Sequence, residues 1–81
     1  MNITIEFHGV LRQLEGEKSA PLTLPDVASV ADAIAALAEQ FTALADRLPS
    51  TACAIGDTLV QRYEPLFEGA ELVLVPPVSG G

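Results

Sequence analysis

Apolar and polar side chains alternate over residues 2–7 of the chain. Ile3, Ile5 and Phe7 fall on one side of an extended backbone, and the residues between them are polar. This period of two predicts a half-buried strand close to the first residue. Its apolar face should enter the core, and its polar face should meet solvent.

A second short strand is predicted over residues 20–24, where two leucines share a face. Pro21 and Pro25 place it at the edge of a sheet or at a strand end, because proline cannot donate a hydrogen bond to a neighbouring strand. Between the two strands, residues 11–16 lead into a turn rich in Glu, Gly and Lys. The two strands together predict an N-terminal hairpin.

The clearest periodic segment lies between residues 30 and 42. Its apolar side chains recur at the three- and four-residue spacing of one helix face, and Asp32, Glu39 and Gln40 lie outside that stripe. Ser29 is a favourable N-cap, and Asp32 three residues later matches the acidic position of a capping box. We therefore predict one amphipathic helix over residues 30–42.

Three short β-prone runs follow the helix. Residues 52–55 and 58–60 are separated by a Gly-Asp pair, which is a hairpin signal. Residues 72–75 form the last run, which ends at Pro76-Pro77. We predict a strand for each run.

Two strands, one helix and three strands, in that order, predict an α+β fold of two layers. The natural candidate is the β-grasp, or ubiquitin-like, roll, in which a mixed sheet packs on one main helix. Its first and last strands lie side by side at the centre of the sheet. Residues 1–76 are predicted to form this domain, and residues 77–81 an extended tail.

Charge and cysteine content narrow the possible partners. The net charge of −7 argues against nucleic acid and anionic membranes, because both are bound through basic side chains. It favours a basic protein partner, or it serves only to keep the domain soluble. Cys53 is the single cysteine, so neither an intramolecular disulfide nor a cysteine metal cluster is expected. The sequence has no leader and no apolar run of spanning length, which predicts a cytoplasmic protein.

The usual catalytic residue types are almost missing from the sequence. His8 is the only histidine, and its place just after a strand is typical of a surface residue. Cys53 lies between two alanines in an apolar strand, which indicates a buried structural thiol. No phosphate-binding loop, nucleotide motif or metal-ligand spacing is present. We therefore predict that the chain is not an enzyme and has no catalytic or metal-binding residue of its own.

The last residues offer a different kind of chemistry. Two prolines hold the chain extended, and Gly80-Gly81 leave the backbone without side-chain bulk. A slim arm of this kind can enter a narrow channel in a partner, where the Gly81 carboxylate would be a covalent handle. The alternative is a frayed terminus that happens to contain glycines.

Residues 72–75 are apolar on both faces. One face must meet the helix, and the other carries Val73 and Val75. With Leu59 nearby, this second face predicts an exposed apolar patch at the root of the tail, suited to docking a partner. The alternative is that loops of the chain cover it.

Three segments resemble one protein family, and the resemblance covers essentially the whole chain. The segments are residues 7–16 (FHGVLRQLEG), 57–60 (DTLV) and 69–81 (GAELVLVPPVSGG). The chain is similar to the ubiquitin-like sulfur carriers of the MoaD/ThiS family. The PPVSGG ending resembles the branch formed by the small subunits of molybdopterin synthase, because the thiamine sulfur carrier usually ends without paired prolines.

The resemblance implies a mechanism in which the chain carries sulfur and binds no cofactor itself. An E1-like enzyme would use ATP-Mg to adenylate the Gly81 carboxylate, and a sulfur donor would convert the adenylate into a thiocarboxylate. The large subunit of molybdopterin synthase, in a heterotetramer with this chain, would be the catalyst. It would use the sulfur to convert cyclic pyranopterin monophosphate into the dithiolene that holds molybdenum.

The resemblance also implies which residues meet the partners. Residues inserted with the tail would be Pro77, Val78, Ser79 and Gly80. The partner interface would contain Phe7, His8, Leu59, Val73 and Val75. His8 departs from the apolar residue that other members often carry in this neighbourhood.

Other functions remain open at this point. Family members also serve other sulfur pathways, such as thiamine thiazole, cysteine, siderophores or the thiolation of tRNA. A protein modifier would join Gly81 to lysines through an isopeptide bond, although Lys18, the only lysine of the chain, makes chains of the modifier on itself improbable. A fourth possibility is an interaction module whose tail is incidental.

Overall fold

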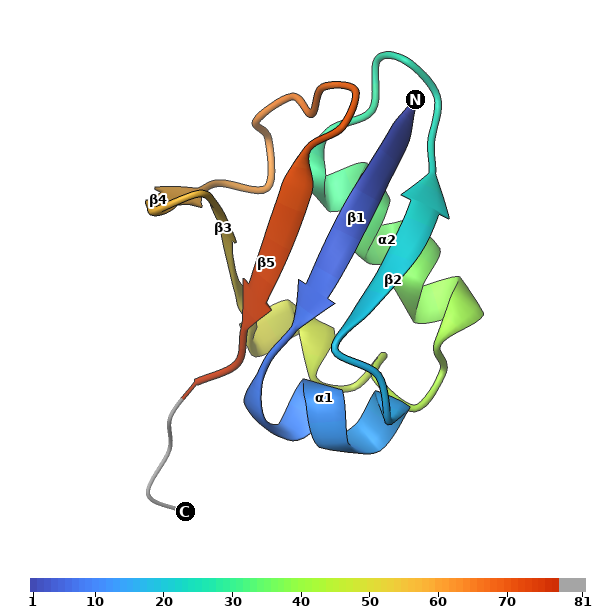
Figure 1. The fold of residues 1–81 in the computed structure, drawn as a ribbon, viewed down its shortest axis with the longest axis vertical. Coiled ribbons are helices and arrows are strands. Elements are labelled where there is room, and N and C mark those ends of the chain that lie inside the picture. The colour runs from blue at the N-terminus through green and yellow to red at the C-terminus, as the bar shows by residue number, and fades with distance from the viewer. Residues whose placement is uncertain (78–81) are drawn as a thin grey trace.

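The computed structural model describes residues 1–77, which form a five-stranded sheet with helix α2 packed across one face (Figure 1). The strands are β1 (Asn2–Phe7), β2 (Ser19–Thr23), β3 (Ala52–Ile55), β4 (Thr58–Val60) and β5 (Glu71–Val75). The helices are α1 (Gly9–Glu15), α2 (Val30–Gln40) and the short 3-10 helix η1 (Leu48–Ser50). This confirms the predicted α+β β-grasp class.

The sheet has the strand order β2-β1-β5-β3-β4. β1 and β5 are parallel and adjacent at its centre, with Ile5 opposite Leu72 and Phe7 opposite Leu74. The other neighbours are antiparallel, so the sheet is mixed, as predicted. β2 is an edge strand, which agrees with the two prolines in and after it.

Helix α2 begins at the predicted N-cap. The Ser29 side chain accepts a hydrogen bond from the Asp32 N–H at 3.3 Å, and the Ser29 N–H donates to Asp32 Oδ2 at 2.8 Å. The capping box is therefore complete. The helix ends at Gln40, two residues before the predicted end at Thr42.

The sequence predicts no helix between the first two strands, but residues 11–15 belong to helix α1, and the chain bends only after it. Leu11 is fully buried and holds α1 against the end of the sheet. Gly16 ends the helix in the left-handed conformation, with φ 78°, and donates its N–H to the Arg12 carbonyl at 2.8 Å. A seven-residue helix is unstable on its own, so this one depends on tertiary packing that a short sequence window does not reveal.

The core lies between the sheet and α2, and it contains one aromatic contact between a buried and a partly buried ring. Phe7 from β1 is only 1% exposed, and its ring meets that of Phe41 edge to face, with 5.9 Å between the ring centroids. The inward side chains of β1 and β5 surround this pair and are all buried: Ile3, Ile5, Leu72 and Leu74. The alternation that predicted β1 is therefore the alternation of its buried and outer faces.

Within residues 1–77, no helix combines the length and apolar character that crossing a membrane requires.

Candidate functional site at the base of the C-terminal arm

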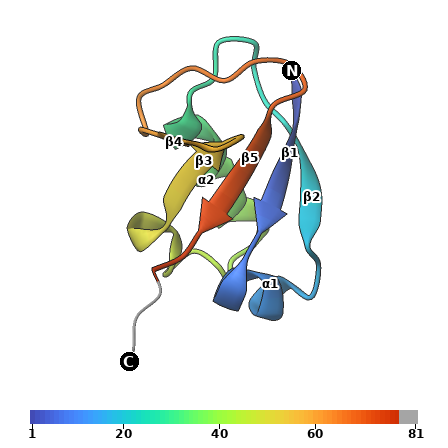
Figure 2. The same cartoon turned by 60° about the vertical axis from the view of Figure 1, so that its left-hand side comes forward.

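The C-terminal arm leaves the domain from the end of central strand β5. β1 and β5 point toward the same end of the sheet, and α1 lies beside the exit of the chain at this end (Figures 1 and 2). Pro76 is partly buried and Pro77 is exposed, and both follow the strand. The handle Gly81 and the tail residues Val78, Ser79 and Gly80 lie outside the described residues.

The outer face of the sheet carries an apolar patch next to this exit. In one row across the strands, Leu59 of β4 and Val73 of β5 flank Ala54 of β3. In the next row, Ala52 pairs with Val75, the last residue before the prolines. We call these five residues the sheet-face patch.

Four of the five residues of the sheet-face patch reach solvent, and Ala54 between them is 8% exposed. Leu59 is 68% exposed and Val75 is 39% exposed, while Val73 is half-buried between neighbouring strands. The alternative, in which loops of the chain cover this face, does not hold for the described residues. Contiguous apolar surface of this kind on a small domain is typical of a docking site.

Phe7 does not belong to this surface, so its predicted place at the partner interface is wrong. Its side chain points to the opposite side of the sheet and packs in the core against Phe41. The alternation of β1 has the same consequence, because Phe7 shares a face with Ile3 and Ile5.

His8 is exposed at the end of β1, one residue beyond the last pair between β1 and β5. Its ring nitrogen Nε2 lies 2.5 Å from Glu6 Oε2, and both side chains are about half exposed. This agrees with a surface histidine, and within residues 1–77 its only side-chain partner is Glu6.

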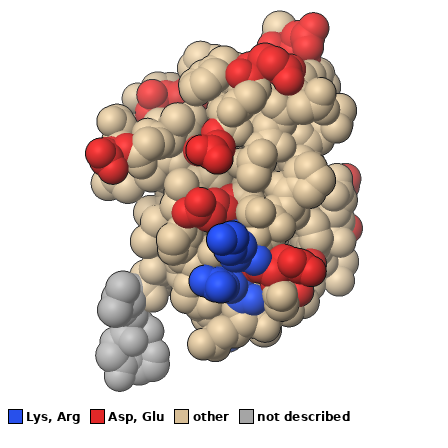
Figure 3. Space-filling view, in the orientation of Figure 1, with Lys and Arg blue, Asp and Glu red and all other residues tan. Residues whose placement is uncertain are grey.

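Carboxylates border the sheet-face patch. Glu6 lies directly opposite Val73 in the parallel register, and Glu71 precedes Leu72 on the same strand. In the view from the sheet side, acidic groups are spread over most of the visible face, and the basic groups gather in one small area (Figure 3). An apolar centre with an acidic border favours a partner that carries basic residues around an apolar contact.

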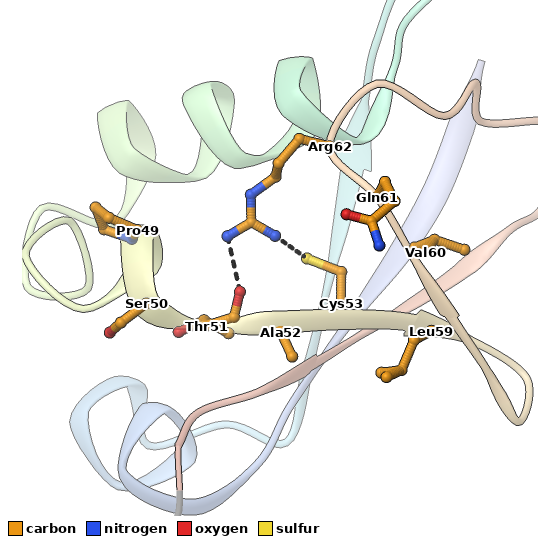
Figure 4. Close-up of a pocket in the computed structure, with 9 residues that line it drawn as sticks. All are labelled: Pro49, Ser50, Thr51, Ala52, Cys53, Leu59, Val60, Gln61 and Arg62. Carbon is orange, nitrogen blue, oxygen red and sulfur yellow. Dashed lines mark hydrogen bonds between the residues drawn. The ribbon is translucent and has the colours of Figure 1, made fainter.

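Cys53 lies under a shallow groove of about 380 Å³ between the start of β3 and the end of β4 (Figure 4). The thiol is buried, and the Arg62 guanidinium donates to its Sγ at 3.0 Å. Burial raises the pKa of the Cys53 thiol, and the nearby Arg62 charge opposes that rise. Because the reactive form is the thiolate, this confirms a structural thiol rather than a nucleophile.

Arg62 is a structural cation that sequence analysis overlooked. Its guanidinium also donates to the carbonyl oxygens of Leu48 and Thr51, at 3.0 and 2.7 Å. It therefore ties the loop after β4 to η1 and to the start of β3. Two of its three partners are backbone carbonyls, for which the sequence has no signal.

Replacing Arg62 by methionine is expected to lower the free energy of unfolding by about 1–3 kcal/mol, because the Leu48 and Thr51 carbonyls lose their charged donor. Arg47→Met is the matched control, since Arg47 is exposed and should change stability by less than about 0.5 kcal/mol. Urea unfolding of the two variants measures the difference. Equal stabilities would show that the Arg62 clamp contributes nothing.

No cluster of three or more His, Cys, Asp or Glu side chains that could hold a metal ion occurs among residues 1–77. The chemistry that the described residues suggest is therefore docking at the sheet-face patch, beside the exit of the arm.

Comparison with known proteins agrees with this picture. A model of the ThiS family matches residues 5–81 of the chain. No curated protein matches it significantly. The solved structure of small archaeal modifier protein 1 from Haloferax volcanii is similar at 25% sequence identity, covers 100% of both chains and has a TM-score of 0.90.

Two further solved structures, of proteins with different names, are also similar to the chain. A chain in the complex of subunits 1 and 2 of molybdopterin-converting factor from Helicobacter pylori is 26% identical, with 100% of both chains covered and a TM-score of 0.71. Small archaeal modifier protein 1 from Methanosarcina acetivorans is 21% identical, covers 99% of this chain and 96% of its own, and has a TM-score of 0.80. The latter shows the likeness of fold alone.

The family model covers nearly the whole chain, and the structures similar to it share the β-grasp fold over their full length. The chain therefore belongs to the ThiS family of small ubiquitin-like sulfur carriers, whose members carry sulfur and are not themselves catalysts.

Proposed function

We propose that this carrier serves molybdenum cofactor biosynthesis. In this proposal residues 1–76 form the docking domain, and residues 77–81 form an arm with Gly81 as its covalent handle. An E1-like enzyme activates the arm, and the large subunit of molybdopterin synthase consumes the sulfur that it carries.

One observation carries the proposal. Only Pro76 separates the arm from Val75, which is itself part of the exposed sheet-face patch. A partner that docks on Leu59, Val73 and Val75 therefore meets the base of the arm in the same contact. Docking and delivery of the C-terminal group into an active site can then occur together.

The chemistry needs two steps at Gly81. Its carboxylate oxygen attacks the α-phosphorus of ATP, which releases pyrophosphate and leaves an acyl adenylate. A sulfide-level sulfur nucleophile from the donor then attacks the acyl carbon, and AMP leaves with the C–O bond that breaks. The product is a thiocarboxylate, a better nucleophile than the carboxylate, and the catalytic groups for both steps belong to the partner enzyme.

The choice of acceptor rests on the PPVSGG ending and on the Helicobacter pylori complex of molybdopterin-converting factor subunits. By analogy, this chain would form a heterotetramer with a dimeric large subunit. Its thiocarboxylate would supply the dithiolene sulfur that is added to cyclic pyranopterin monophosphate.

A protein modifier is the second candidate, and the structural likeness to the Haloferax volcanii modifier protein favours it. In that function the Gly81 adenylate would react with a lysine amine of another protein, and an isopeptide bond would form with loss of AMP. Both candidate functions begin with the same adenylation of Gly81. They differ only in the group that reacts with the adenylate and in the final acceptor.

Intact mass spectrometry of the protein isolated from its own cells tests the proposal. A gain of about 16 Da, in which sulfur replaces one oxygen, is expected on the wild-type chain. A variant that lacks Gly81 should not show this gain, which would locate the change at Gly81. If the mass never shifts and only lysine-linked forms are found, the chain is a modifier and the carrier proposal fails.

The acceptor is tested with the purified thiocarboxylate form. Mixed with the large synthase subunit and cyclic pyranopterin monophosphate, it should yield dithiolene product and lose the extra 16 Da or so. The form without the thiocarboxylate is the control. Absence of product with this subunit would overturn the assignment to molybdenum cofactor and favour another sulfur pathway.

A further inference from the structure

Gly9 lies beside the base of the arm, although 66 residues separate it from Val75 in sequence. The cause is the parallel pairing of β1 and β5, which ends with Phe7 opposite Leu74. The segments that follow β1 and β5 leave the sheet at the same end, so the first residue of α1 lies beside the first residue after β5. A methyl group on Gly9 would lie 3.2 Å from Cγ of Pro76 and 3.9 Å from its Cδ.

Two separate features of Gly9 exclude a side chain. Its φ of +56° lies in the left-handed region, which residues with a Cβ adopt at a cost. A Cβ at this position would also lie closer to Pro76 Cγ than the roughly 3.5–4.0 Å at which carbon atoms ordinarily pack. Three other described glycines also have positive φ, but a Cβ on Gly16, Gly56 or Gly69 would have no heavy atom within 4 Å.

The direction of Pro76 matters because the arm continues from it, so a small rotation of Pro76 changes the direction in which the arm leaves. Relief of a 3.2 Å contact requires the proline ring to move by a few tenths of an ångström, a rotation of roughly 10° over the width of the ring. Five residues beyond Pro76 span up to about 16 Å when extended. In an arm that a partner holds extended, the same rotation would shift the far end by roughly 3 Å, and a 1 Å misplacement of a reacting group can cost about 100-fold in rate.

We infer that Gly9 is a positioning residue, whose missing side chain lets Pro76 set the direction in which the arm leaves the domain. The inference rests on the proposed function, because it concerns the presentation of the same arm to the activating enzyme. Gly9 acts through Pro76 and does not touch the reacting group itself.

The test compares Gly9→Ala with Gly16→Ala in thiocarboxylate formation by the E1-like enzyme with ATP-Mg and sulfide. Gly9→Ala should lower kcat about tenfold and leave KM within about twofold, because the sheet-face patch is unchanged. Gly16→Ala carries a similar φ strain at the other end of α1, where a Cβ meets no atom. It should lower the melting temperature by a similar amount and leave kcat unchanged.

A double-mutant cycle with Pro76→Ala shows whether the effect passes through this ring. In the Pro76→Ala background, Gly9→Ala should lower kcat by less than about threefold, because the Cγ that it would meet is gone. The fall in melting temperature caused by φ strain should remain.

Equal kcat for Gly9→Ala and wild type would overturn the inference. The inference would also fail if Gly9→Ala lowered kcat by the same factor in the wild-type and the Pro76→Ala backgrounds. Failure of the proposed function looks different: either the wild-type chain acquires no sulfur at all, or it acquires sulfur normally and yields no dithiolene product with the large subunit.

Discussion

Replacing Phe7 with alanine is expected to lower the free energy of unfolding by about 3–5 kcal/mol. The side chain is 1% exposed, and its loss removes both the edge-to-face contact with Phe41 and the filling of the centre of the core. A domain of this length has a total stability of about 4–12 kcal/mol, so the variant loses a large share of it. Chemical unfolding followed by circular dichroism measures the change.

Phe67→Ala is the matched control, because it is the same substitution at a side chain that is 55% exposed in the loop between β4 and β5. It should cost less than about 1 kcal/mol. If Phe7→Ala leaves stability intact and instead weakens partner binding, Phe7 is an interface residue after all and its place in the core is wrong.

Leu59→Asp is expected to weaken binding to the large synthase subunit by at least about thirtyfold, or about 2 kcal/mol. Leu59 is 68% exposed in the free chain, so the substitution should change folding stability by less than about 1 kcal/mol. In the complex, however, a carboxylate in place of this exposed leucine of the sheet-face patch would be buried without a partner, which is costly. Isothermal calorimetry with the purified subunit measures the affinity.

Val27→Asp provides the control with the same added charge. Val27 is 90% exposed in the loop between β2 and α2, at the opposite end of the molecule from the exit of the arm (Figure 1). Its effect on affinity should stay within about twofold, which is what a distant charge contributes once salt screens it. Equal losses in the two variants would mean that net charge, and not the sheet-face patch, governs docking.

The function proposed for the arm depends on three separate parts of the domain. The core around Phe7 holds the sheet, the sheet-face patch around Leu59 docks a partner, and Gly9 with Pro76 directs the arm. A substitution at one of these places should change one measured quantity: stability, affinity or kcat. Such a division is possible because opposite faces of one sheet carry the core and the patch.

Features that depend on residues close together in the sequence could be predicted without the structure. The alternation over β1, the capping box at Ser29 and the edge position of β2 all follow from the nearest few residues, so they could be predicted. The two apolar faces of β5 likewise predicted both the core side and an exposed patch. The order of the elements was then enough to indicate the β-grasp roll.

Features that depend on contacts between residues far apart in the sequence could be seen only in the folded protein. Helix α1 forms because Leu11 is buried against the end of the sheet, and its seven residues have too weak a periodicity to predict it. Arg62 reaches backbone carbonyls that no side-chain pattern marks. The parallel pairing of β1 with β5 brings Gly9 against Pro76, and so the exit of the arm is governed by a residue from the other end of the chain.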